Sequence, residues 1–474
     1  MKKIEIENFK AFGEKTELKL NKLNIFSGLN SNGKSSLYQA LLLFSQSLDT
    51  WIQQGNSLLP RLELNGKFIN LGNEEEILFF KDNKKILFSF EWENGRKLTS
   101  KYELNPTQGK FILIYSKYTL VNKENKISSY ELKKENNIWK LKAINLLSFA
   151  ESDIHIKLNK FYNSEKDYLN AEVEFENITN IMFHRGLLVS FQVKKDEIKN
   201  ILLPEYKEHF QQETFFNTNP NLNSIEFRTS LNREDIILLF SLLNILYIPA
   251  FRGMPQRVYL KEKNPLEKYA NKKNRKVRYD VFLETKNIKS GTLEEALNYW
   301  VADKFNIAEK VIVKESIGTL VSEIFIKLNN KEIPINNVGF GTSQIIPIIA
   351  EVLTSNNQGI TIIDEPEIHL HPKLQSQLAE FFYKMSILHP NIIIETHSEY
   401  LIEKLIYFKI KYSNIDNINM YWIDKISNDK GSKIIEIEYD DYGYILNAPE
   451  NFLSEKIKIV DELQKLRLEK IENE

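Results

Sequence analysis

Alternation of apolar and polar residues at the start of the chain predicts three short strands. Their apolar positions lie in residues 4–6, 18–20 and 23–26. A period of two is typical of a strand with one buried face. From Ser35 to about Gln54 the apolar spacing changes to three and four residues, which predicts a helix with a buried face.

Short alternating runs continue over residues 77–195 and predict a β-rich region. The first two runs are joined by Asn94 and Gly95, a pair that is typical of a tight hairpin turn. The region has no heptad repeat, so a long coiled-coil arm is not expected. The runs cover residues 86–104, 110–121, 137–144, 153–158, 171–176 and 186–193.

Helical and strand patterns are mixed in the rest of the chain. Thr292 is a plausible N-cap, with Glu294 and Glu295 in the first turn that follows. The apolar run Ile360–Ile363 suits a buried parallel strand. We predict helices over residues 196–212, 234–246, 291–307 and after Gly339, and strands around 311–314, 323–328, 360–363 and 391–395.

Composition narrows the class of protein. With 474 residues, of which 42% are apolar and 12% aromatic, the chain is long enough for two or three domains with sizeable cores. Its 63 basic and 64 acidic residues nearly cancel, so any contact with nucleic acid or a membrane has to be local. The absence of cysteine excludes disulfides and thiolate metal sites and fits a reducing compartment.

The sequence predicts neither a signal peptide nor a membrane span. The N-terminus alternates apolar and charged residues, as a strand does. The longest apolar stretch, Ile236–Phe251, is broken by Ser241, Asn244 and Pro249. We therefore expect a soluble, cytoplasmic protein.

One stretch of the chain is strongly basic. Between Arg252 and Arg278 there are ten Lys or Arg residues and two Glu. A solvated loop and a contact with nucleic acid or an acidic partner surface are both compatible with such a run.

The most specific motif is Gly-Leu-Asn-Ser-Asn-Gly-Lys-Ser-Ser at residues 28–36. It matches the pattern G-x-x-x-x-G-K-[ST], in which backbone N–H groups close around a polyphosphate at a helix N-terminus. Lys34 is expected to reach the terminal phosphates, and the Ser35 hydroxyl to take a magnesium position. A glycine turn capping a core helix is the alternative, which the flanking strand and helix disfavour. The predicted ATP contacts are Asn30, Ser31, Asn32, Gly33, Lys34, Ser35 and Ser36.

Two acids follow the apolar run at residues 360–363. Neighbouring side chains on a strand point to opposite sides, so Asp364 and Glu365 are expected to have different roles. Asp364 is assigned to magnesium, and Glu365 to polarising an attacking water. Acid pairs at strand ends also occur as loop caps, and it is the phosphate loop that favours the catalytic interpretation.

Several histidines follow these acids in the sequence. His397 follows the next apolar strand, where an imidazole can hydrogen-bond a γ-phosphate and sense its presence, so it is the second predicted catalytic residue. His369 and His371 have no third ligand at a sensible spacing. We interpret them as loop residues that contact a neighbouring subunit or the core.

A glycine-rich turn opens the helix predicted after residue 338. Free N–H groups and small hydroxyls there face whatever lies beyond the helix N-terminus. An ordinary capped helix would have the same pattern. The residues of this turn are Gly339, Gly341, Thr342, Ser343 and Gln344.

In chain order, the phosphate loop, the glycine-serine turn, the Asp-Glu strand and the His strand resemble four motifs of the ABC-type ATPase superfamily. These are its Walker A, signature, Walker B and switch-histidine motifs. Within the superfamily the chain looks like the bacterial AAA15/OLD-like ATPases, which are related to RecF and the SMC proteins. The segments of this chain that have counterparts in that family are NFKAF, GLNSNGKSSLYQALLL, YIPAFRGMPQRVY, VGFGTSQIIPII, IIDEPEIHLHPKLQ, IIETHSEYLI and EYDDYGYILNAPENF.

The resemblance covers residues 1–75, 245–260 and 330–455. It implies an α/β fold, with an ABC-type P-loop ATPase head interrupted by a β-rich and helical insertion. The domains expected are the N-terminal part of the head (1–76), the insertion (77–244), a head-proximal segment with the basic loop (245–330) and the C-terminal part of the head (331–474).

The resemblance also implies ATP and Mg²⁺ as cofactors and a head-to-tail homo-oligomer. In it, the signature turn (Gly339, Gly341, Thr342, Ser343 and Gln344) of one copy caps ATP held by another copy. This turn has Gly-Thr-Ser where transporters have Ser-Gly-Gly, which leaves open which hydroxyl reaches the phosphate. Lys10, in NFKAF, is a further expected ATP contact. The glutamine-bearing switch loop of the family has no assigned position here.

Three functions follow as hypotheses. The first is an ATP-dependent switch for a separate nuclease or toxin in anti-phage defence, by resemblance to the ATPase subunits of Septu, PARIS and retron-associated modules. OLD nucleases carry a Toprim domain, and its acid pattern does not follow His397, so the effector is expected on another polypeptide. The second is a repair or recombination ATPase that binds DNA through Arg252–Arg278. The third, a transporter motor, is disfavoured by the insertion and the signature.

Overall fold

Two compact units divide the chain. Unit 1 consists of Met1–Leu20, Ser35–Ile245 and Ile426–Ser432, and unit 2 of Asn21–Lys34, Leu246–Lys425 and Lys433–Glu474. The computed structural model describes residues 1–53, 61–93, 95–121, 127–136, 138–146, 169–175, 180–184, 187–194, 198–202, 224–228, 241–252, 258–260, 274–315, 321–355, 359–389, 391–412, 417–427, 429–440, 442, 444–447, 449 and 452.

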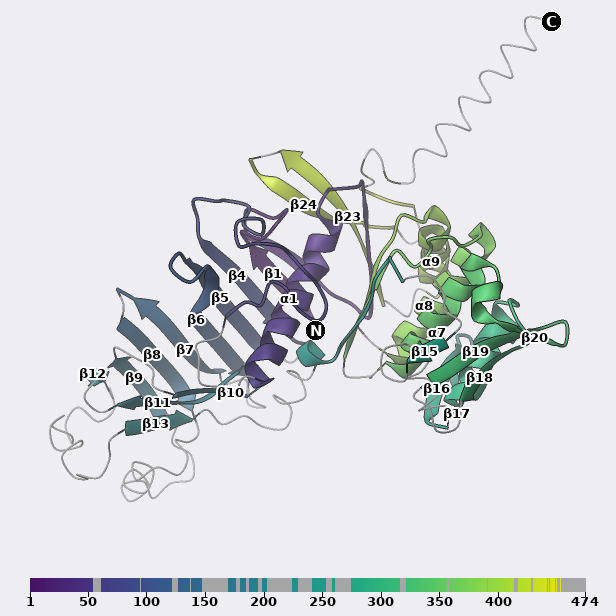
Figure 1. Ribbon diagram of the computed structural model, residues 1–474. Coiled ribbons are helices and arrows are strands. Elements are labelled where there is room, and N and C mark those ends of the chain that lie inside the picture. The colour runs from purple at the N-terminus through teal and green to yellow at the C-terminus, as the bar shows by residue number, and fades with distance from the viewer. Residues whose placement is uncertain are drawn as a thin grey trace, which may run out of the picture. The chain divides into compact units, whose positions relative to one another are not determined.

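Unit 1 is built on a nine-stranded sheet in which all neighbouring strands are antiparallel (Figure 1). Its order is β12-β9-β8-β7-β6-β5-β4-β1-β2. The strands are β1 (Lys3–Glu7), β2 (Thr16–Lys19), β4 (Lys85–Glu91), β5 (Lys97–Asn105), β6 (Lys110–Val121), β7 (Ile127–Glu135), β8 (Ile138–Leu146), β9 (Leu169–Phe175) and β12 (Ile198–Leu202). A smaller sheet contains β10 (Asn180–His184), β11 (Leu187–Lys194) and β13 (Ser224–Arg228).

Helix α1 (Lys34–Gln53) packs on this sheet through its apolar face. The ring of Phe44 lies 4.7 Å from that of Phe90 and 6.4 Å from that of Phe88, between ring centroids. All three side chains are buried, so the helix face predicted from apolar spacing is a core face.

Most of the predicted strands of the β-rich region are confirmed. The predicted hairpin joins β4 to β5, with Gly95 at a φ of 77°, and Asn94 lies outside the described residues. Strand β7 was not among the predicted runs, and the run at 153–158 lies outside the described residues. The helix predicted over 196–212 is wrong at residues 198–202, which form β12. Pairing of β12 with β9 outweighs the weak helical spacing there.

Unit 2 is built on a six-stranded sheet in the order β14-β21-β22-β3-β23-β24. The central pairs, β21 with β22, β22 with β3 and β3 with β23, are all parallel. The side chains of β22 are buried at every position, as the continuous apolar run predicted. The strands are β14 (Ile245–Ile248), β21 (Ile360–Asp364), β22 (Ile392–Glu395), β3 (Leu23–Gly28), β23 (Ile418–Ser427) and β24 (Gly431–Glu436).

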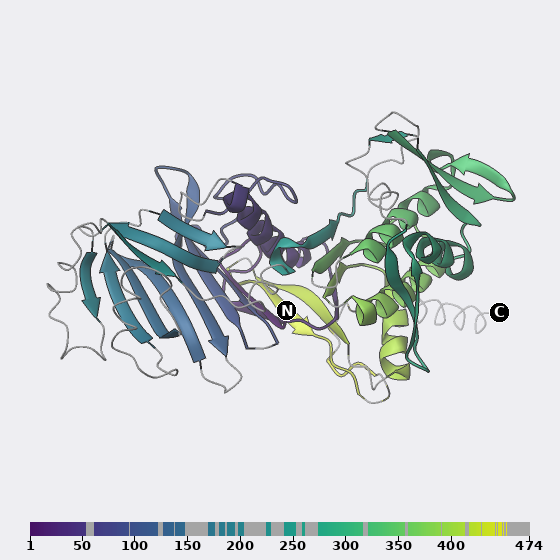
Figure 2. The same cartoon turned by 90° about the horizontal axis from the view of Figure 1, so that it is seen from below.

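Helices and two small sheets complete unit 2 (Figure 2). The predicted N-cap is confirmed, because Thr292 and Glu295 form a reciprocal capping box at the start of α6. The helices are α6 (Leu293–Asn298), the π-helical η3 (Tyr299–Lys304), the 3-10 helix η4 (Ile335–Asn337), α7 (Phe340–Thr354), α8 (Pro372–Leu388) and α9 (Glu399–Lys411). The strands are β15 (Val258–Leu260), β16 (Lys276–Phe282), β17 (Asn287–Thr292), β18 (Lys310–Glu315), β19 (Val321–Leu328) and β20 (Lys331–Pro334).

A buried charge network joins α8, β16 and η3 in the core of unit 2. Lys384 Nζ lies 2.9 Å from Asp280 Oδ1, and the Tyr299 hydroxyl donates to Asp280 Oδ2 at 2.5 Å. Because buried charges are costly unless they are paired, the network fixes the relative positions of these three elements.

Two expectations concern partners outside the chain. In the part of the chain that the structure describes, every helix is too short or too polar to cross a membrane. The basic stretch between Arg252 and Arg278 lies largely outside the described residues.

Candidate functional site

The predicted motifs of unit 2 gather at one edge of its sheet. The carboxyl ends of parallel strands meet at the same edge, where α/β sheets bind their ligands. The register places Asp364 of β21 opposite Glu395 of β22, and Glu395 opposite Phe26 of β3. The phosphate loop follows β3 directly, so this edge carries the loop, both acids of the Asp-Glu pair and the segment that leads to His397.

The phosphate loop has backbone angles that few side chains tolerate. Gly28 and Gly33 have φ values of 148° and 93°, and Ser31 has a φ of 65°. A Cβ atom at Gly28 would lie 2.4 Å from the Ile423 carbonyl oxygen, so only glycine fits there. The buried Asn32 side chain donates to the same carbonyl oxygen at 3.4 Å. Strand β23 therefore anchors the loop.

Lys34 is folded back onto its own loop. Its Nζ donates to the carbonyl oxygens of Gly28 at 3.1 Å and Leu29 at 3.0 Å. It also lies 3.8 Å from Glu395 Oε1, and both side chains are about 95% buried. Burial lowers the pKa of Lys34, and the nearby carboxylate of Glu395 opposes that effect.

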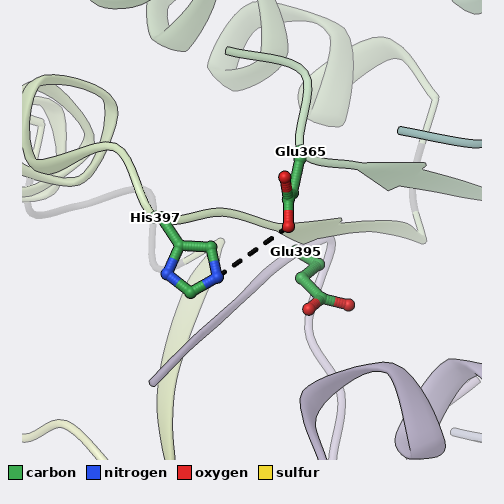
Figure 3. Close-up of side chains that lie close together, drawn as sticks. All are labelled: Glu365, Glu395 and His397. Carbon is green, nitrogen blue, oxygen red and sulfur yellow. Dashed lines mark ion pairs between the residues drawn. The ribbon is translucent and has the colours of Figure 1, made fainter. Parts of the chain in front are cut away.

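Glu365 and His397 face one another across the edge of the sheet (Figure 3). His397 Nε2 lies 3.9 Å from Glu365 Oε1, and both side chains are about one-third exposed. Glu365 has a φ of 40°, a strained value for a residue other than glycine. Its backbone N–H donates to the Glu395 carbonyl oxygen at 2.9 Å, which ties the ends of β21 and β22 together.

Carboxylate oxygens suit magnesium, and this edge supplies them. Asp364 ends β21 and Glu365 follows it, and hard oxygen ligands of this kind are the ones that Mg²⁺ prefers. Ser35, the other predicted ligand, is the second residue of α1 and belongs to unit 1. One atom each from Glu365, Glu395 and His397 lie within 4.8 Å of one another, a spacing that could hold a metal ion.

Glu367 is tied to the segment that carries His397. Its Oε1 accepts a hydrogen bond from the His397 backbone N–H at 2.6 Å. Burial raises the pKa of Glu367. Burial also lowers the pKa of His397; the charge of Lys34 adds to that effect and the carboxylate of Asp364 opposes it.

Arg252 was missed as a site residue because the sequence placed it in the basic stretch. Its guanidinium donates to the carbonyl oxygens of Asp364 and Glu365, both at 3.3 Å, and to that of Pro249 at 3.2 Å. Burial lowers its pKa, and the carboxylate of Glu367 opposes that effect. Nothing in the sequence alone shows that these backbone groups meet.

The two glycines that open α7 have different surroundings. A Cβ atom at Gly341 would lie 2.8 Å from the His369 carbonyl oxygen, so this glycine packs against its own chain. A Cβ atom at Gly339 would meet no described atom within 4 Å, and Gly339 has a φ of −54° that any residue adopts. The ring of the exposed Phe340 contacts the His369 imidazole at 4.7 Å, between ring centroids.

The polar side chains of the same turn also differ. The buried Ser343 hydroxyl donates to the Phe340 carbonyl oxygen at 2.6 Å, and Gln344 is buried as well. Thr342 is only partly buried, unlike Ser343 and Gln344. His371, in contrast, has a local role, because its Nδ1 accepts from the Lys373 N–H and caps α8.

The remaining predicted ATP contacts divide between the units. Asn30 and Ser31 are exposed in the loop of unit 2. Ser36 is buried in the first turn of α1, in unit 1. Lys10 is also in unit 1, where its Nζ donates to Gln39 Oε1 at 2.7 Å. The nucleotide contacts assigned to these residues stay predictions.

Sequence comparisons identify relatives of the chain. A sequence model described as AAA ATPase domain, AAA_15, matches residues 1–402. The retron Vc95 "probable ATPase" of Vibrio cholerae serotype O1 biovar El Tor is 29% identical over 138 residues, which cover 23% of this chain and 26% of that protein. The chain thus matches about a quarter of the length of this curated relative.

Solved structures of SMC heads are also similar. The SMC head domain from Thermotoga maritima has a TM-score of 0.36 and 12% identity, covering 92% of this chain and 98% of that chain. The Smc head domain with an extended coiled coil, bound to the C-terminal domain of ScpA derived from Pyrococcus furiosus, has a TM-score of 0.37 and 10% identity, covering 98% of this chain and 99% of that chain.

Proposed function

Because the chain belongs to the AAA_15 family of AAA ATPase domains, we propose that it binds ATP with Mg²⁺ at the phosphate loop and hydrolyses ATP between two copies of itself. The edge of the unit 2 sheet supports this proposal. There the loop with Lys34, the Asp364-Glu365 pair and His397 follow parallel neighbouring strands. This is the arrangement that phosphoryl transfer to water needs.

Different residues of the chain have different roles in the proposed hydrolysis. Backbone N–H groups of the loop and the ammonium of Lys34 bind the phosphates. Glu365 orients and polarises the attacking water, and His397, held by Glu367, contacts the γ-phosphate. Magnesium, held by Asp364 and Ser35, would neutralise charge on the phosphate oxygens.

The exposed end of α7 supports a site shared between copies. Gly341 is explained by its contact with the His369 carbonyl, but nothing described in this chain requires a glycine at residue 339. An approach by a phosphate bound to a second copy would require one there. Dipolar or cationic groups from a second chain can raise phosphoryl transfer by about 10³ to 10⁵-fold.

Complementation between two inactive variants tests this shared site. Gly339→Leu blocks the turn without a clash in its own chain, and Lys34→Ala disables the loop. Each variant alone is expected to be inactive, whereas an equimolar mixture should recover about one quarter to one half of wild-type ATPase activity. Each mixed dimer has one intact site of two. The recovered fraction is about one quarter if the copies pair at random, and about one half if the Lys34→Ala copies pair only with Gly339→Leu copies. Phosphate release measured across mixing ratios gives the result.

A matched control variant distinguishes a block at residue 339 from the general effect of adding a leucine side chain to the surface. Lys331→Leu adds the same side chain at an exposed position of β20, and it should leave activity unchanged. If the Gly339→Leu variant is as active as the wild type, or if mixing restores nothing, the shared site is excluded.

Arg252 is expected to affect turnover more than nucleotide binding. Its planar fork donates to two consecutive carbonyl oxygens beside the strained Glu365, which an ammonium cannot do in the same geometry. Arg252→Lys should lower kcat about tenfold and change KM for ATP less than twofold. Arg278→Lys, at an exposed position of the same basic stretch, should change neither. A large rise in KM at unchanged kcat would contradict this role.

The cellular role that we propose is a nucleotide-dependent switch for a separate effector, such as a nuclease or toxin. The sequence similarity to a retron ATPase supports this role. ATP would hold two copies together and hydrolysis would release them. Affinity purification of the tagged chain from its native operon, with Glu365→Gln and Lys34→Ala as nucleotide-state variants, should recover an effector that depends on the variant. Gel shifts with DNA that weaken steeply with salt would instead favour a repair ATPase.

A further inference from the structure

Glu395 is a buried carboxylate with no role among the predicted site residues. It ends β22, between the strand of the phosphate loop and the strand of the Asp-Glu pair, and it is 4% exposed. Its Oε1 lies 3.8 Å from the Nζ of the equally buried Lys34. A buried carboxylate is costly unless a cation compensates it, so Lys34 is part of what makes Glu395 tolerable there.

Groups of the chain itself surround the Lys34 ammonium. An ammonium has three N–H donors, and two of them are used by the carbonyl oxygens of Gly28 and Leu29. The third side of the ammonium faces Glu395. A phosphate that binds Lys34 must therefore share or replace partners that the chain itself supplies.

The charge around Lys34 is unfavourable for a bare anion. Burial lowers the pKa of Lys34, and three carboxylates oppose that effect, in decreasing order those of Glu395, Glu365 and Asp364. Arg252, another cation near these carboxylates, directs its Nη1 and Nη2 donors to backbone carbonyl oxygens. A polyphosphate that arrives without a cation would add negative charge to a region where carboxylates already outnumber cations.

We infer that Glu395 makes nucleotide binding depend on a divalent cation, because it competes for Lys34 and repels a polyphosphate that carries no metal. Glu395 is then a specificity-determining residue, which favours the metal complex over free nucleotide. This inference rests on the proposed function, since it takes Lys34 to be a phosphate ligand. It assigns Glu395 no part in bond breaking.

The test compares nucleotide affinity with and without metal. Binding of a fluorescent ATP analogue to the full chain is measured in MgCl2 and in EDTA. Glu395→Gln, which keeps the size of the side chain, should raise metal-free affinity about tenfold and change affinity for the magnesium complex less than threefold. The ratio of the two affinities should therefore fall about tenfold. A metal-free affinity that is unchanged or weaker would overturn the inference.

Three variants complete the test. Glu403→Gln removes the same charge at an exposed position of α9 and should keep the wild-type ratio. Glu395→Asp retains the charge, and it should also keep the wild-type ratio of the two affinities. A lower ratio in this variant would show that side-chain shape rather than charge is responsible. If Glu395→Gln does not fold, Glu395→Asn, which leaves room for a water beside the ammonium, should lower the ratio in its place. If the wild type binds no nucleotide under either condition, the proposed function itself fails.

Discussion

Glu365→Gln is expected to lower steady-state ATP hydrolysis by roughly 10²–10³-fold while nucleotide affinity stays within a few-fold of the wild type. The amide keeps the size of the carboxylate but cannot accept a proton from water. The backbone of Glu365 is held by the Glu395 carbonyl and by Arg252, so the substitution leaves the end of β21 in place. The loss should therefore fall on kcat.

Three measurements check this result. Phosphate release gives kcat, titration with a fluorescent nucleotide gives Kd, and light scattering after size exclusion gives the mass of the assembly with ATP. We expect the variant to accumulate as an ATP-bound assembly, because the step that releases it is blocked. Glu403→Gln is the control for loss of one charge. Hydrolysis at the parental rate would show that another group polarises the water.

Lys34→Ala is expected to weaken ATP binding by roughly 10²–10³-fold. Two effects add in this variant. The phosphates lose a charge-assisted hydrogen bond, and Glu395 is left buried next to the phosphate position without its cation. With no nucleotide bound, the ATP-dependent assembly should not form either.

The design of this experiment separates the two effects. Lys22→Ala removes an exposed lysine just before β3 and should bind ATP normally. The double variant Lys34→Ala with Glu395→Gln should recover part of the lost affinity, because the uncompensated carboxylate is gone. If Lys34→Ala binds ATP as tightly as the wild type, the phosphate-binding role of the loop is wrong.

Much of the site was predictable because its signals are local. The pattern at residues 28–36 fixes a strand, a turn and a helix start in one contiguous stretch, and the structure has β3 and α1 on either side of it. The apolar run before Asp364 predicted a parallel strand for the same reason, and β21 confirms it. The resemblance to AAA15-type ATPases is confirmed at the level of the family.

Arg252 and Glu395 show what local signals leave out. Arg252 acts on carbonyl oxygens more than a hundred positions away in sequence, and a basic run reveals no such partner. Glu395 follows three isoleucines, and its meeting with Lys34 depends on β22 lying between β21 and β3. Strand order and register are long-range facts, and hydrophobic spacing does not contain them.

The error at β12 has a related cause. Residues 198–202 have apolar side chains at positions 198, 201 and 202, a helical spacing over too short a run to exclude a strand. The neighbour that decides the outcome is β9, at residues 169–175. Thr292, in contrast, was predictable to the residue, because a capping box needs only the first turn of its own helix.

The strands of the two units should differ in how freely their sequences can change during evolution. None of the predicted site residues lies on β4–β13, so those strands can change sequence and even surface chemistry under selection for a new target. The short strands β3, β21 and β22 have no such latitude, since Glu365, Glu395 and Lys34 constrain one another through main-chain and charge contacts. Divergent homologues should therefore preserve the spacing at this edge while the long antiparallel sheet drifts.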